Sequence, residues 1–303
     1  MDRVSPCGAC TSKDTHFFFA VLLSMAFIAL LGNSLLLFLI QIDSTLHTPM
    51  YFFLSQLSCL DIGQIFIVVP KMSVGFLTQR YGISLSGCVT QIFLSVTLGS
   101  SESFLLAVMS YDRYVAICRP LQYPVLMRRT ICIIMTVGIW SSSSLIILVI
   151  AVYVQSLPYC GSNVIKHFVC EFPALLKLSC TDTSAFEKVI YLDNVLIIFL
   201  PILVIFSSYI AILVQVLSMH SIERRHKALG TCLSHLIVVS IFFGASMLNY
   251  TVPVSSYSSQ RSMINSVFIT VVPPVLNPFI YSLRNRDVMA ALKKLFVKCI
   301  PQK

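Results

Sequence analysis

Charged side chains are scarce in this sequence. Asp, Glu, Lys and Arg make up only 11% of the 303 residues, whereas 57% are hydrophobic. A soluble domain usually carries about 25% charged residues, so this chain has too little polar surface to keep a water-soluble fold dispersed. The sequence also lacks a hydrophilic stretch long enough for a second domain. We therefore expect one membrane domain over residues 1–303.

The N-terminal segment lacks two common signals. It has no Asn-X-Ser/Thr glycosylation site, and the only such triplet, Asn249-Tyr250-Thr251, lies in an apolar stretch where it should be inaccessible. The first apolar stretch, about 24 residues long, is too long for the hydrophobic region of a cleavable signal peptide and favours a signal-anchor span. Cys7-Gly8-Ala9-Cys10 is a lone C-x-x-C, a weak signal without a redox-type fold around it, and we interpret the pair as incidental.

Seven segments carry few or no charged residues over roughly the 20 residues that a helix needs to cross a bilayer. A single apolar run would also fit a buried core helix, but seven runs with flanking charges favour membrane spans. The segments are Phe17–Ile40, Pro49–Val69, Ser86–Cys118, Ile131–Tyr153, Val189–Leu217, Ala228–Val252 and Met263–Leu283.

The positive charge is concentrated between particular spans. The net charge is +9, and twelve of the 21 basic residues lie in the loops Arg119–Thr130 and Ser218–Lys227 and in the tail from Arg284. The positive-inside rule therefore places the tail, residues 284–303, in the cytoplasm and the N-terminal residues 1–16 outside, with spans and loops over 17–283. The charge indicates topology, and we expect no binding of nucleic acid.

Four cysteines lie on the predicted outer side. The long loop Val154–Glu187 contains Cys160, Cys170 and Cys180, and Cys88 opens the third span on the same face. The outside is oxidising, so these thiols can pair, and four cysteines allow three pairings among which geometry does not choose. The cysteines near the membrane or cytosol should stay reduced; they are Cys59, Cys118, Cys132, Cys232 and Cys299.

The tail after Leu283 has a helical period. Apolar residues recur at three- and four-residue spacing among lysines, which predicts an amphipathic helix along the inner membrane surface. The apolar positions are Val288, Ala291, Leu292, Leu295 and Phe296. Cys299 at its end is either a palmitoylation site or a plain thiol.

Two acids lie inside predicted spans, where ionisable groups are costly and informative. Asp61 lies 12 residues after Pro49 and Glu102 ten residues before Asp112, which places both about 15–18 Å from the inner ends of their helices. Together they can hold a sodium ion or share a proton, because two close carboxylates resist ionising together. The alternative is that each acid forms hydrogen bonds with Ser, Asn or water.

Asp112-Arg113-Tyr114 lies at the cytoplasmic end of the third span. An adjacent acid and base at a membrane edge limit the cost of desolvation by pairing. Arg113 cannot lose its proton, so leaving Asp112 requires another partner, which is the behaviour of a switch.

The seventh span carries Pro273, Pro274 and Pro278, which remove backbone donors and kink a helix. Asn277 and Tyr281 place polar groups beside the kink. The pattern favours a bend that can move, with a static kink as the alternative.

These residues lie within long strings that resemble rhodopsin-like G-protein-coupled receptors and, within them, olfactory receptors of the tetrapod-type branch. The strings are LHTPMYFFLSQLSCLD (Leu46–Asp61), MSYDRYVAICRP (Met109–Pro120), Ser207-Ser208-Tyr209, RHKALGTCLSH (Arg225–His235), PVLNPFIYSLRNRD (Pro274–Asp287) and Gly32-Asn33, with HFVCE and LLKLSC in the outer loop. They cover nearly every span in the right order.

The resemblance implies an all-α seven-transmembrane helix bundle with a short amphipathic helix after the seventh span. It implies the disulfides Cys88–Cys170 and Cys160–Cys180. It implies no enzyme activity and no cofactor other than the sodium ion considered above. The partners would be an odorant, the lipid bilayer and the olfactory stimulatory G protein, which raises cAMP. The protein would be located in the plasma membrane of olfactory cilia. The residues of the activation region would be Asp112, Arg113, Tyr114, Tyr209, Asn277, Pro278 and Tyr281.

The resemblance also places a ligand pocket in the outer halves of spans three, five, six and seven. This lining is mostly apolar with a few hydroxyls and an amide, which suits a small volatile molecule, although any one position can equally serve helix packing. The positions are Ser95, Val96, Gly99, Ser100, Asn194, Ile197, Ile198, Phe243, Met247, Tyr250 and Thr270. Asp193 is the one acid near this level and either binds an amine or faces water.

Some positions depart from the family pattern. Phe243 stands where the family more often has Tyr, and no acid opens span six to hold Arg113, with Glu223 the nearest candidate. His167–Glu171 has residue types that bind copper, but Cys170 is expected in a disulfide and is then not a thiolate.

Two other classes of membrane protein fit the sequence less well. A secondary transporter would use Asp61 and Glu102 for ion coupling, but should have inverted repeats and broken helices, and neither is found. A membrane enzyme would need a nucleophile–base pair or a metal cluster, and His235 has no obvious catalytic partner in the sequence.

Overall fold

Helices make up most of the protein. The computed structural model describes residues 12–78, 82–160, 170–250, 259–283 and 286–299. The elements are α1 (Ser12–Ile42), η1 (Ser44–Leu46), α2 (Pro49–Thr78), α3 (Leu85–Cys118), α4 (Tyr123–Leu126), α5 (Arg129–Ser156), α6 (Phe172–Leu176), α7 (Ser184–Leu217), α8 (Ile222–Tyr250), α9 (Ser259–Leu283) and α10 (Arg286–Cys299). Within these residues the strand-like pairing is limited to one isolated bridge between Tyr159 and Ser179.

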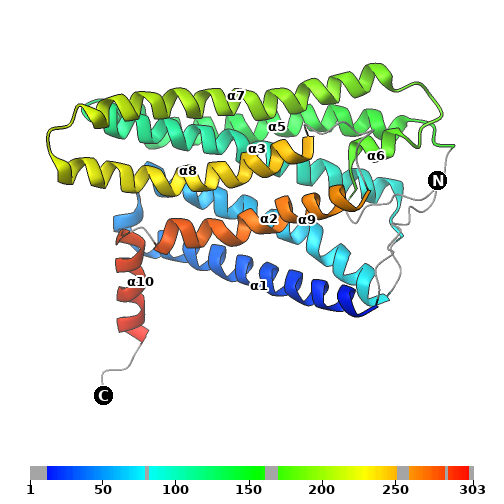
Figure 1. Ribbon diagram of the computed structural model, residues 1–303, viewed down its shortest axis with the longest axis horizontal. Helices are drawn as coiled ribbons and strands as arrows, with labels where there is room; N and C mark the ends of the chain where they lie inside the picture. Colours follow the sequence, from blue (N-terminus) through cyan, green and yellow to red (C-terminus); the bar gives the residue numbers. More distant parts are fainter. Residues whose placement is uncertain (1–11, 79–81, 161–169, 251–258, 284–285, 300–303) are drawn as a thin grey trace.

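The long helices run side by side in one bundle, and α3 is central in it. It packs against α2, α5, α7 and α8, while α1 packs against α2 and α9, and α9 against α8. Figure 1 shows α10 lying crosswise at one end of the bundle and α6 at the opposite end. The predicted all-α seven-helix bundle is confirmed.

The helices are long enough to cross a membrane. In the described part of the chain, six helices contain a sufficiently long apolar window, and α9 contributes a shorter apolar stretch, Phe268–Ser282. Since α9 has 25 residues, it is about 37 Å long and also reaches across a bilayer. Large apolar side chains cover the outside of the bundle, among them Phe27 and Phe206, which are 67% and 65% exposed. Lipid tails are the solvent in which such a surface is stable.

Several helix boundaries differ from the predicted segments. The second segment was expected to end at Val69, before Pro70, but α2 continues to Thr78. A proline removes one backbone donor, whereas ending the helix inside lipid would leave several groups without partners. The basic loop Ser218–Lys227 was also expected to be irregular, but α8 begins at Ile222. The loops that hold α4 and α6 gain these short helices at Pro124 and Pro173, because proline fits the first helical turn.

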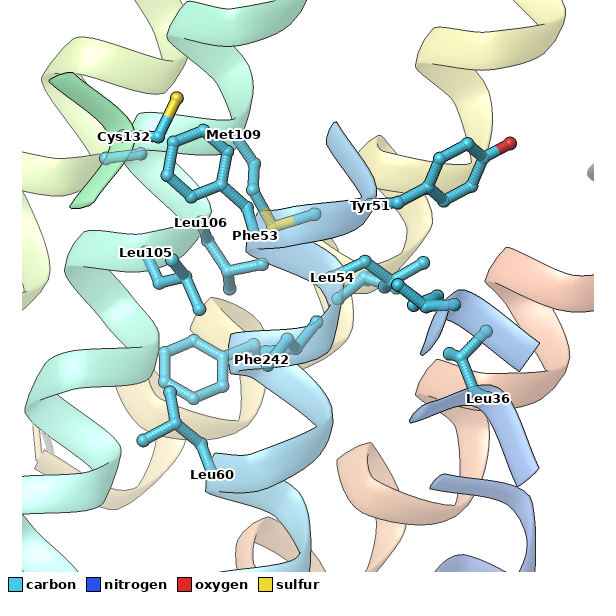
Figure 2. Packing of buried hydrophobic residues seen from close by; sticks show 14 of the residues in the cluster. Leu36, Tyr51, Phe53, Leu54, Leu60, Leu105, Leu106, Met109, Cys132 and Phe242 are labelled. Atoms are coloured by element: carbon cyan, nitrogen blue, oxygen red, sulfur yellow. The ribbon is translucent and has the colours of Figure 1, made fainter. Parts of the chain in front are cut away.

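The largest apolar core lies toward the inner half of the bundle. Leu105, Leu106 and Met109 of α3 meet residues of α2 such as Phe53, and Phe242 of α8 closes the cluster. Figure 2 shows these side chains directed toward one another from different helices. This packing fixes how each helix is rotated about its own axis, and therefore which polar side chains face the interior.

A close contact joins α1 to the proline-rich α9. Pro278 has no N–H, so it leaves the carbonyl of Pro274 without its helical partner. Asn33 Nδ2 donates to that carbonyl at 2.9 Å. Gly32 permits the approach, because a Cβ there would lie 2.9 Å from Pro278 Cγ. The Gly32-Asn33 pair therefore supplies a partner for the carbonyl that Pro278 leaves free in α9.

A similar hydrogen bond to a carbonyl freed by proline joins α3 to α7. Pro201 lies inside α7 and frees the carbonyl of Ile197, four residues earlier. Ser103 Oγ donates to this carbonyl at 2.6 Å. The hydroxyl thus satisfies a buried acceptor and fixes α3 against α7 at this depth.

The predicted tail helix is present as α10. Val288 and Ala291 are buried against the bundle. Lys294 Nζ lies 3.1 Å from Asp43 Oδ2, and Tyr51 OH donates to Asp287 Oδ2 at 3.2 Å. Hydrogen bonds from Thr45, together with Lys294, lower the pKa of Asp43 to about 2, so the carboxylate that pairs with Lys294 stays ionised at neutral pH. The side chains of Phe296 and Cys299 lie outside the described residues.

Candidate functional site

The inner end of α3 holds an ion pair between a buried acid and a partly buried arginine. Arg113 donates from Nη2 to Asp112 Oδ2 at 2.5 Å and from Nε to the same oxygen at 3.2 Å. The side chain of Asp112 is 1% exposed and that of Arg113 14%. The second oxygen of Asp112 accepts from Tyr123 OH of α4 at 2.9 Å.

Tyr123 is a hydrogen-bond partner of Asp112 that the sequence did not reveal. The sequence has no acid at the start of span six to hold Arg113, and the structure pairs Arg113 with Asp112, whose other oxygen Tyr123 occupies. Burial and the neighbouring Asp112 carboxylate raise the pKa of the Tyr123 phenol, so the hydroxyl stays protonated and keeps donating. Asp112 therefore links α3 to α4 as well as to Arg113.

Aromatic side chains of α7, α8 and α9 lie near enough to Arg113 to interact with it. Tyr209 OH of α7 lies 2.8 Å from Nδ1 of His235 on α8, and their rings stack. The Tyr281 hydroxyl on α9 is buried and has no hydrogen-bond partner among the described residues. Tyr114 packs with Ile212 and Val216 at the junction of α3, α7 and α8. His235 thus has Tyr209 as its partner, and this contact joins α7 to α8.

A second polar cluster lies deeper in the bundle. Asn277 of α9 donates from Nδ2 to both carboxylate oxygens of Asp61, at 3.2 and 3.0 Å. Glu102 of α3 is 6% exposed, lies close enough to Asp61 and Asn277 to interact with both, and leaves Oε1 without a partner among the described residues. The two acids that the sequence placed at similar depth are therefore brought together, with Asn277 as a third member. The described residues contain no group of three or more His, Cys, Asp or Glu side chains that could hold a metal ion.

The expected ligand positions lie on four helices, α3, α7, α8 and α9. Ile198 and Phe243 belong to one buried cluster against which Met247 packs, and Val96 packs into a second cluster near the outer end. Ser100 and Thr270 are buried, and Ser95, Asn194 and Ile197 are partly buried. Beside Gly99 there is open space, because a Cβ would meet nothing within 4 Å. The side chain of Tyr250 lies outside the described residues.

Two disulfides close the outer end. Cys88 pairs with Cys170, and Cys160 pairs with Cys180, as the resemblance implied. Beside Cys170, α6 buries Phe172 and Leu175 in the second cluster with α3 and α5. The outer loop is therefore fixed over the end of the bundle. His167, Cys7 and Cys10 lie outside the described residues, and Asp193 is partly buried on α7.

Comparison with known proteins gives consistent matches. The family model described as olfactory receptor matches residues 22–299. The chain is 48% identical to human olfactory receptor 2T2 over 281 residues, 93% of this chain and 87% of that protein. It is 47% identical to human olfactory receptor 2M5 over 292 residues, 96% of this chain and 94% of that protein. It is 48% identical to human olfactory receptor 2Z1 over 284 residues, 94% of this chain and 90% of that protein.

Proposed function

Because the chain belongs to the olfactory receptor family, we propose that it binds a small volatile molecule within the helix bundle and activates the olfactory stimulatory G protein, which raises cAMP. The protein is a multi-pass receptor of the plasma membrane and not an enzyme. No covalent step is needed, because a ligand shifts the receptor toward its active state by binding that state more tightly.

The ion pair of Arg113 with the buried Asp112 is the observation that carries this proposal. The charge of Arg113 is neutralised by a carboxylate that Tyr123 also holds. Arg113 can leave only if other groups replace that partner. The hydroxyls of Tyr209 and Tyr281 stand near enough to interact with it electrostatically. We propose that they turn to Arg113 when α8 swings outward, which opens an inner cleft for the G protein.

The cytoplasmic loop supplies an apolar contact for such a partner. Leu121 is 95% exposed and Val125 68% exposed, both beside the Asp112–Tyr123 contact. Apolar side chains that project into the cytosol are explained by a protein partner better than by lipid. Since Tyr123 lies between them, a protein that binds this loop would act directly on the partner of Asp112.

We propose that the ligand binds at the depth of Ser95, Gly99, Ile197 and Phe243 in the bundle. Open space beside Gly99 supports this placement. We also propose that the N-terminus is extracellular, that the tail is cytoplasmic and that the protein resides in olfactory cilia, as the distribution of basic residues favours.

We propose that Asp61 and Glu102 hold a sodium ion. The unpartnered Glu102 Oε1 supports a bound cation, because buried carboxylate oxygens nearly always have a partner. A cation that links α2, α3 and α9 favours the resting arrangement.

Replacing external choline by sodium should therefore lower odorant potency several-fold, and Asp61→Asn should remove this dependence. A wild-type receptor with equal potency in both salts would favour a shared proton instead.

The direct test of function is a cAMP reporter assay with an odorant panel. Cells that carry the receptor and the olfactory stimulatory G protein should show a ligand-dependent rise in cAMP, and cells without that G protein should not. An N-terminal epitope stained on intact cells measures surface receptor and, at the same time, the proposed orientation. Surface receptor that raises no cAMP with any odorant would contradict the proposal.

A further inference from the structure

A group of polar side chains lies between α2 and α3, nearer the outer end than the two acids. Its members are Gln64 on α2 and Gln91 and Ser95 on α3. Gln64 lies three residues beyond Asp61, and Ser95 lies seven residues before Glu102, so about one to two helical turns separate this group from the acids. Neither the activation switch nor the sodium site makes use of these residues.

The orientation of Gln64 is determined by one hydrogen bond. Its Nε2 donates to the backbone carbonyl of Ser95 at 3.4 Å. A carbonyl only accepts, so this contact assigns nitrogen and oxygen in the Gln64 amide. The remaining Oε1 is therefore an acceptor, and it is buried without a partner among the described residues.

Ser95 and Gln91 add two more unpartnered atoms. Ser95 Oγ and Gln91 Nε2 are buried, and neither has a hydrogen-bond partner in the described part of the chain. Gln91 is only 7% exposed. The two residues are four apart on α3 and therefore share one face of the helix. Three buried polar atoms within about one turn thus lack partners, although such atoms nearly always have one.

There is room beside this group. Gly99 lies one turn further along the same face of α3, and a Cβ there would meet nothing within 4 Å. Gly63 on the facing helix is different, because its Cβ would lie 2.9 Å from Leu98 Cδ1. The open space therefore lies beside Gly99, which is one of the proposed ligand positions and is one turn from Ser95.

We propose that Gln64, Gln91 and Ser95 form the polar subsite of the odorant pocket and that this subsite binds the hydroxyl group of an alcohol. The alcohol donates its proton to Gln64 Oε1, and its oxygen accepts from Gln91 Nε2 and Ser95 Oγ. The carbon chain then extends past Gly99 toward Ile197 and Phe243. This inference rests on the proposed function and narrows the ligand class.

Other ligand classes satisfy this subsite less well. An ether or aldehyde accepts but cannot donate, so it would leave Gln64 Oε1 buried and unpaired, and a thiol is only a weak donor. A site built to bind a hydroxyl rejects analogues that lack it, because its buried polar groups then stay unpaired. The subsite thus favours alcohols over ligands of equal length and shape.

The test compares 1-alkanols from pentanol to decanol with methyl ethers, aldehydes and thiols of matched length in the cAMP assay. In the wild-type receptor we expect the best alcohol to be about tenfold more potent than its matched ether. In Gln64→Leu this preference should fall to within about twofold, because the acceptor is gone while the volume is kept. Gln155→Leu, an exposed glutamine on α5, is the matched control and should keep the full preference.

Surface staining shows whether each variant reaches the membrane, and Ser95→Ala is a milder second variant that should weaken the same preference. Equal potency of alcohols and ethers in the wild type, or an unchanged preference in Gln64→Leu, would overturn the subsite. If the receptor raises cAMP with other odorants and with no alcohol, the subsite is wrong and the proposed function stands. Silence toward the whole panel with receptor at the surface would contradict both.

Discussion

Arg113→Ala should abolish the odorant-dependent rise in cAMP while the receptor remains in the membrane. The substitution removes the cation that Asp112 holds at the inner end of α3. It also removes the group that Tyr209 and Tyr281 would engage in the active arrangement. Because the active arrangement then lacks the cation that these hydroxyls would engage, the response should fall to the level of cells without receptor.

The matched control is Lys188→Ala, which removes an exposed cation near the outer end of α7, far from this cluster. It should leave both surface staining and the response unchanged.

Tyr123→Phe should raise the cAMP signal, whereas Arg113→Ala lowers it. It removes one hydrogen bond to Asp112, weakens the hold on Arg113 and should raise basal cAMP a few-fold. A full odorant response from Arg113→Ala would show that the receptor switches without this pair.

Loss of the Cys88–Cys170 disulfide should remove most receptor from the cell surface, and loss of Cys160–Cys180 should have a smaller effect. The first bond links residues 82 apart in sequence and the second links residues 20 apart. By loop-closure entropy these separations correspond to about 4.5 and about 3.3 kcal/mol. Both values are upper limits, because the helices stay inserted in the unfolded state and already restrict the chain.

The packing around Cys88 and Cys170 is a second reason to expect the larger effect from loss of this disulfide. Cys88 is fully buried, and Cys170 lies next to α6, whose Phe172 and Leu175 join the core between α3 and α5. Releasing Cys170 therefore loosens a packed segment as well as a loop. The measurement is surface staining of Cys88→Ser and Cys160→Ser, with Cys59→Ser as a control for a thiol that forms no disulfide. Equal surface levels for the first two variants would contradict the entropic account.

The sequence alone determined that seven spans exist and where the amphipathic tail helix forms, and it predicts which side the basic loops face. Each of these depends on a local pattern: a long run without charge, a cluster of Lys and Arg, or apolar residues at helical spacing. Lipid reinforces such patterns, because a backbone inside it must form its hydrogen bonds within its own helix. For this reason Asp61 and Glu102 could be placed at similar depth by counting residues.

Only the tertiary structure decided which polar atoms meet. Asn277 reaches Asp61 across 216 residues of sequence, Asn33 reaches the Pro274 carbonyl across 241, and Ser103 reaches the Ile197 carbonyl across 94. These contacts depend on how far each helix is rotated about its axis and how deep it sits against its neighbours. Packing of the apolar core sets both quantities, and no periodicity along one helix contains them.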